Sequence, residues 1–109
     1  MTRRWIIRLG LTLALIAAAF DGFAAAMLMV SQKKRSFTVE EVVIHQGDTL
    51  DIVNDDLFTH QVYVDSPSFK FDSDESDPGS SIKLTFTEAG TFEVHCHIHP
   101  KMLLQVTVQ

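Results

Sequence analysis

The chain has 109 residues, of which 46% are hydrophobic and 21% are charged, and its formal net charge is −5. This length suits a single domain, and the acidic balance argues against a nucleic-acid-binding surface, which needs clustered Lys and Arg. The sequence holds one Cys, so it excludes an intramolecular disulfide.

The N-terminal segment has the composition of an export signal. Three Arg within the first eight residues precede an uncharged, apolar run over residues 9–20. Ala24 and Ala26 then offer the small side chains of a cleavage site, and "TRRWIIR" loosely fits a twin-arginine signal. We expect residues 1–26 to be an export signal, with a mature N-terminus near Met27.

An uncleaved membrane anchor over residues 9–30 is the alternative. Asp21 would then lie inside the span, at a cost of about 2.5–3.5 kcal/mol. Basic residues stand on both sides of the segment, so the positive-inside rule does not predict which end would face the cytoplasm. Both interpretations place the remaining chain outside the cytoplasm, in the periplasm or an equivalent exported location, either free or attached to the membrane.

Removal of residues 1–26 leaves six Lys and Arg against 13 Asp and Glu, a net charge of −7. We expect a linker over residues 27–35 and a small domain over residues 36–109. A domain with such a small core gains stability from a cross-link such as a bound metal. A free thiol in an oxidising compartment needs burial or a metal.

Strand-like segments follow one another through the predicted domain. They alternate apolar and polar residues, or are rich in β-branched and aromatic ones, with turn signals between them. A long loop is expected over residues 66–81. The expected strands are 36–44, 49–54, 60–65, 82–88, 91–96 and 103–109. This series predicts an all-β sandwich.

Strand parity places two metal-ligating residues on the apolar face. Residues two apart in a strand share a face. His60 therefore lies with apolar residues of strand 60–65, and Cys96 lies with those of strand 91–96. His95 is expected to point outward beside Glu93.

The segment "HCHIHPKM" at residues 95–102 adds the spacing Cys-x-x-His-x-x-Met. Cys96, His99 and Met102, together with His60, make one thiolate, two imidazoles and one thioether. This donor set is that of a trigonal copper site with a weak axial Met, whereas zinc favours a fourth Cys, His or carboxylate.

Each of these residues also has a structural interpretation. Cys96 could be a buried thiol, His60 a hydrogen-bonded core histidine, and Met102 a core residue beside two Leu. His95 and His97 are expected to be solvated or to support the ligands, and His45 to lie on the surface. The acidic run 72–77 lacks the Gly and flanking helices of an EF-hand. It could be a solvated loop or a patch that steers a basic partner.

These residues resemble the cupredoxins, the blue copper proteins, over roughly residues 37–109. "CHIHPKM" is similar to the short ligand loop of the amicyanins, within the plastocyanin-like group. The resemblance implies a Greek-key β-sandwich with one type 1 copper held by His60, Cys96, His99 and Met102. Many cupredoxins place an Asn after the first ligand His, where it ties the ligand loops together. Gln61 stands there in this chain.

The resemblance implies a one-electron carrier, monomeric and without enzymatic activity, between redox partners such as a dehydrogenase or a cytochrome. It also implies that electrons pass through the ring edge of His99, within an apolar patch of Pro100, Met102 and Leu103. The alternatives are a periplasmic protein that stores or delivers copper, a copper-enzyme subunit that uses His95 and His97 at a second site, and a metal-free adhesive sandwich.

Overall fold

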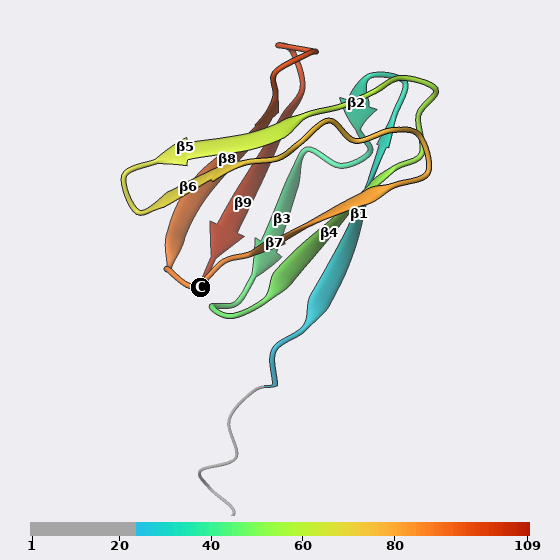
Figure 1. The fold of residues 1–109 in the computed structure, drawn as a ribbon. Helices are drawn as coiled ribbons and strands as arrows, with labels where there is room; N and C mark the ends of the chain where they lie inside the picture. Colours follow the sequence, from blue (N-terminus) through green and yellow to red (C-terminus); the bar gives the residue numbers. More distant parts are fainter. Residues whose placement is uncertain (1–23) are drawn as a thin grey trace, which may run out of the picture.

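The computed structural model describes residues 24–109, which form two β-sheets packed face to face (Figure 1). The first sheet has the order β2 (Ser36–Phe37), β1 (Met27–Lys33), β4 (Thr49–Asn54) and β7 (Ser81–Thr85). The second has the order β3 (Glu41–Ile44), β9 (Leu103–Val108), β8 (Gly90–Cys96), β5 (Val62–Ser66) and β6 (Phe69–Asp72). The predicted all-β sandwich is confirmed. No helix within residues 24–109 is long and apolar enough to cross a membrane.

The core lies between the two sheets and follows the predicted alternation. Leu50 and Ile52 of β4 face Val94 of β8 and Leu104 and Val106 of β9, and all five are fully buried. Alternate residues of each strand face the other sheet. The alternation of apolar and polar residues in the sequence therefore predicts which of these side chains point into the core. The two sheets therefore fix which residues at the strand ends point inward.

The expected linker over residues 27–35 differs from the structure. Met27–Lys33 form β1, which pairs in parallel with β4 from Met27 opposite Thr49 to Gln32 opposite Asn54. Val30 and Gln32 are buried there. The inward Gln32 hides the alternation that marks a strand, and the parallel partner is remote in sequence. The predicted export signal lies almost wholly in residues 1–23, outside the described residues, and stays a prediction.

The expected loop over residues 66–81 is also wrong in part. Phe69–Asp72 form β6, a hairpin with β5 in which Phe69 stands opposite Ser66. The Phe69 ring packs edge-on against Phe86, with ring centroids 4.9 Å apart. Polar residues around this short strand conceal its alternation. The expected strand 36–44 is likewise divided into β2 and β3.

Candidate metal centre

Three potential ligand atoms meet at one end of the sandwich. His60 precedes β5, Cys96 ends β8, and His99 lies in the loop between β8 and β9. Cys96 Sγ lies 3.7 Å from His60 Nδ1 and 3.8 Å from His99 Nδ1, and the two Nδ1 atoms are 3.2 Å apart. Among residues 24–109, these three form the one group of three or more His, Cys, Asp or Glu residues arranged to hold a metal ion.

The register of β5 and β8 brings His60 to Cys96. Val62 stands opposite Cys96, so the residues before Val62 lie beside the end of β8. The Gln61 backbone N–H donates to Cys96 Sγ at 3.4 Å, and the His97 N–H donates to the Gln61 carbonyl at 2.9 Å. The backbone of Gln61 thus joins the two ligand segments. Its side chain bonds instead to the Ser73 carbonyl, at 3.1 Å.

Met102 lies inside the protein, at the end of the β8–β9 loop. It is 2% exposed, and its backbone N–H donates to the His99 carbonyl at 3.0 Å. This turn folds the loop back over Cys96, as the spacing predicts. Met102 is therefore not part of an apolar surface patch, which corrects one expectation. The exposed apolar residues at this end include Leu57, Phe58 and Ile98 in the loops and Leu103 at the start of β9.

Asp56 orients the His60 ring. Asp56 Oδ2 lies 3.0 Å from His60 Nε2, and both side chains are buried. Burial alone would raise the pKa of Asp56. Hydrogen bonds from the Arg35 and Leu57 backbone N–H groups and the contact with His60 outweigh burial and hold the pKa below its ordinary value. The ionised carboxylate accepts a hydrogen bond from the Nε2–H group, so Nδ1 presents its lone pair to Cys96.

Asn54 organises the loop that carries Asp56. Its side-chain amide donates to the Phe58 carbonyl at 2.9 Å and to the Ser76 carbonyl at 2.8 Å, and its oxygen accepts the Asp56 N–H. The His60 N–H donates to the Ser76 carbonyl, which links the acidic segment 72–77 to the site. The sequence pattern indicates a role for neither Asn54 nor Asp56. Asn54 is the last residue of β4, where a polar side chain breaks the apolar alternation, and Asp56 lies in the irregular loop that follows, which has no periodic signal.

His99 is suited to bind a metal in its neutral form. Burial, followed by the nearby His60 and Arg35, lowers the pKa of His99 below its ordinary value. The Phe58 ring meets it edge-on, with ring centroids 6.3 Å apart. Because imidazole must be deprotonated to coordinate a metal, this environment favours ligation near neutral pH.

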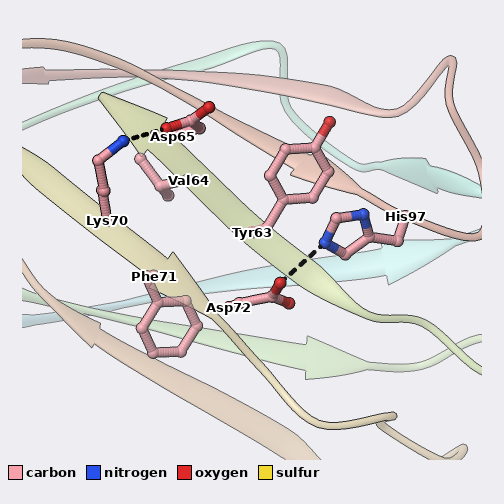
Figure 2. A pocket seen from close by; sticks show the side chains of 7 residues that line it. All are labelled: Tyr63, Val64, Asp65, Lys70, Phe71, Asp72 and His97. Carbon is pink, nitrogen blue, oxygen red and sulfur yellow. Dashed lines mark hydrogen bonds and ion pairs between the residues drawn. The ribbon is translucent and has the colours of Figure 1, made fainter. Parts of the chain in front are cut away.

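His95 and His97 are engaged elsewhere. Figure 2 shows the His97 ring beside Tyr63, with its Nε2 atom 3.1 Å from Asp72 Oδ2. The His97 and Tyr63 rings stack with centroids 3.9 Å apart. His95 Nε2 lies 3.1 Å from Glu93 Oε2, which confirms the expected outward direction. His45 is also exposed, as expected.

The donor geometry fits a bound metal ion. Two donors that each lie roughly 2.0–2.3 Å from a shared ion are about 3–4 Å apart, as the sulfur and both Nδ1 atoms are here. One thiolate and two imidazoles in a trigonal arrangement are the equatorial donors of a blue copper site. A buried thiol alone would not explain two imidazoles turned toward it.

Comparison with known proteins identifies the class. Residues 24–109 match the model of the copper-binding proteins of the plastocyanin/azurin family, and the chain belongs to this family. Copper is its cofactor, and the predicted cupredoxin fold is confirmed.

The similar proteins include amicyanins. Amicyanin from Paracoccus denitrificans is 31% identical over 97 residues, which cover 80% of this chain and 72% of the relative. The structure of a reduced amicyanin variant has a TM-score of 0.71 at 28% identity, with 84% of this chain and 89% of that chain covered. Amicyanin from Paracoccus versutus has a TM-score of 0.70 at 27% identity, with 84% and 88% covered.

Proposed function

We propose that this protein is an exported one-electron carrier with a single type 1 copper held by His60, Cys96, His99 and Met102. The observation that carries the proposal is the convergence of Cys96 Sγ with the Nδ1 atoms of His60 and His99. The buried Met102, at the end of the same loop, would supply a thioether as the fourth ligand.

The chain contributes rigidity around the metal. Copper, when bound, supplies a one-electron exchange between its two oxidation states. Asp56 fixes the His60 ring, and the Gln61 backbone fixes the distance between the ligand segments. Ligands held this way move little when the charge of the ion changes. Four protein ligands leave no open position for a substrate, which supports a carrier rather than an enzyme.

We place the electron portal at His99. Its ring is partly exposed, whereas the His60 side chain is buried. Ile98 and Leu103, exposed by 43% and 48%, offer apolar contact to a redox partner such as a dehydrogenase or a cytochrome. Small apolar patches of this kind suit transient encounters between proteins.

The acidic domain and the export-like N-terminal segment support a periplasmic, monomeric protein. Mass spectrometry of the native protein tests the export prediction. A mature N-terminus near Met27 would support cleavage. An intact N-terminus in a membrane fraction would favour the anchor instead.

Copper storage or delivery finds less support. Met27 and Met29 are exposed and could bind Cu(I), but they pair with Thr49 and Asp51 at the start of β4. The ligand His60 follows the other end of β4. These thioethers therefore lie away from the site and cannot pass an ion directly to it.

The portal is tested by electron self-exchange of the copper-loaded protein, measured by NMR line broadening in mixtures of the oxidised and reduced forms. We expect Leu103→Lys and Pro100→Glu each to slow exchange, because a charge resists desolvation at the contact. The visible spectrum should stay nearly unchanged, since neither side chain is a ligand. Unchanged rates in both variants would contradict a portal at His99.

A further inference from the structure

The surface beside His99 carries an unusual share of the positive charge. Residues 24–109 contain six Lys and Arg, and four of them are Lys33, Lys34, Arg35 and Lys101. The first three belong to the β1–β2 hairpin, and Lys101 lies in the β8–β9 loop. Figure 1 shows both segments at the same end of the sandwich, away from the C-terminus. A domain with a net charge of −7 thus gathers cations where its ligands meet.

Contacts join these cations to the ligand His99. Arg35, Ile98, His99, Pro100 and Lys101 line one shallow hollow of about 300 Å³, and none of the acidic residues of the described chain lines it. The Arg35 guanidinium carbon lies 4.1 Å from the centroid of the Phe58 ring, which meets the His99 ring edge-on. We call Lys34, Arg35 and Lys101, with the apolar Phe58 and Ile98, the basic flank.

The cations of the basic flank differ from Lys70 and Lys83. Lys70 forms an ion pair with Asp65 at 2.6 Å, and Lys83 forms one with Asp51 at 3.7 Å. Lys34, Arg35 and Lys101 are exposed and form no ion pair within residues 24–109. Their charge is therefore available to another molecule.

The backbone of the hairpin gives an independent reason to assign these cations a role. Lys34 and Arg35 have φ angles of 55° and 56°, and Lys33 stands opposite Ser36 across the turn. Such two-residue turns favour Asn-Gly, because L side chains rarely adopt the left-handed region. The Asp56 carboxylate holds this turn through the Arg35 N–H at 2.7 Å. The conformation of the turn therefore does not explain why Lys34 and Arg35 stand at these two positions.

We propose that the basic flank docks a redox protein whose own docking surface is acidic. This inference rests on the proposed electron carrier and adds the charge of its partner. Cations around an apolar centre attract an acidic surface and orient it over His99. The acidic segment 72–77 approaches the site through Ser76 and does not line this hollow. A lipid surface fits less well, because it has no group to exchange an electron at His99.

The test uses two variants with the same change in net charge. Lys34→Glu/Lys101→Glu reverses the basic flank and leaves Arg35 on Phe58. Lys70→Glu/Lys83→Glu is the matched control on other surfaces. Copper-loaded proteins are mixed with an acidic and with a basic c-type cytochrome at an ionic strength of about 0.1 M, where the Debye length is about 10 Å. Visible spectra confirm that the copper site of each variant is intact.

With the acidic cytochrome we expect the flank variant to react about tenfold more slowly than the unmodified protein. The control variant should change much less, and the basic cytochrome should react faster with the flank variant. Equal effects of the two variants would show that net charge alone acts and would overturn the inference. So would unchanged cytochrome rates combined with lost binding to phosphatidylglycerol vesicles. An unmodified protein that is not blue, or that exchanges electrons with neither cytochrome, would instead contradict the proposed function.

Discussion

The two ends of the sandwich use buried acidic residues for different purposes. At the end away from the ligands, Asp48 accepts the backbone N–H groups of Ala26 and His45, each at 2.8 Å. At the ligand end, Asp56 accepts backbone N–H groups and also orients the His60 ring. One carboxylate closes a turn, whereas the other also directs a metal-ligating side chain. Both carboxylates therefore stabilise the fold, and Asp56 in addition orients a metal ligand.

The largest expected effect comes from Cys96→Ser, which should abolish the intense visible absorption of the copper-loaded protein. The thiolate is the source of that absorption, and a hydroxyl does not replace it. His95→Ala is the control, because its ring contacts Glu93 and Tyr63 outside the ligand cluster. Absorption spectroscopy decides the matter, and a blue Cys96→Ser protein would mean that another residue binds the copper.

Exchanging the two buried acids for amides sharpens the comparison between the ends. We expect Asp56→Asn to lower copper affinity by about 10–100-fold, because groups that orient metal ligands typically contribute this much. Asp48→Asn should leave copper affinity unchanged and lower the free energy of unfolding. Competition titration with a chelator and urea denaturation measure the two quantities. If both variants bound copper with equal affinity, the proposed role of Asp56 in orienting His60 for metal binding would be contradicted.

Substitution of Met102 should shift the reduction potential in opposite directions while copper stays bound. An amide oxygen favours Cu(II), so Met102→Gln should lower the potential. An apolar side chain removes the axial donor, so Met102→Leu should raise it. Voltammetry measures both shifts. If both variants move the potential in the same direction, Met102 is a core residue and not an axial ligand.

Acidification should produce the smallest effect, in the metal-free protein. The pKa of Asp48 is lowered by hydrogen bonds from Ala26 and His45, and that of Asp56 is also lowered. A carboxylate with a lowered pKa in the folded state stabilises the protein above its unfolded pKa of about 3.9. That stability is lost as pH falls through the lower folded value. Urea denaturation below about pH 5 should show this loss, and it should be weaker in Asp48→Asn.

The sequence predicted the features that depend on local alternation. Parity along strands 60–65 and 91–96 placed His60 and Cys96 inward, and the three-residue spacing brought His99 to them. β1 was missed, because its parallel partner is remote and its inward Gln32 breaks the pattern. Asp56 was missed because its contact with His60 depends on the path of an irregular loop, which has no period to read.

Titration of the purified metal-free domain with copper, followed by visible absorption, tests the proposed copper centre most directly. We predict an intense blue absorption that rises linearly and stops at one copper per chain. Three donor atoms within 4.8 Å of one another offer a place for one ion. A protein that binds copper without visible absorption, or that needs a second copper at His95 and His97 to become coloured, would contradict the proposed mononuclear site.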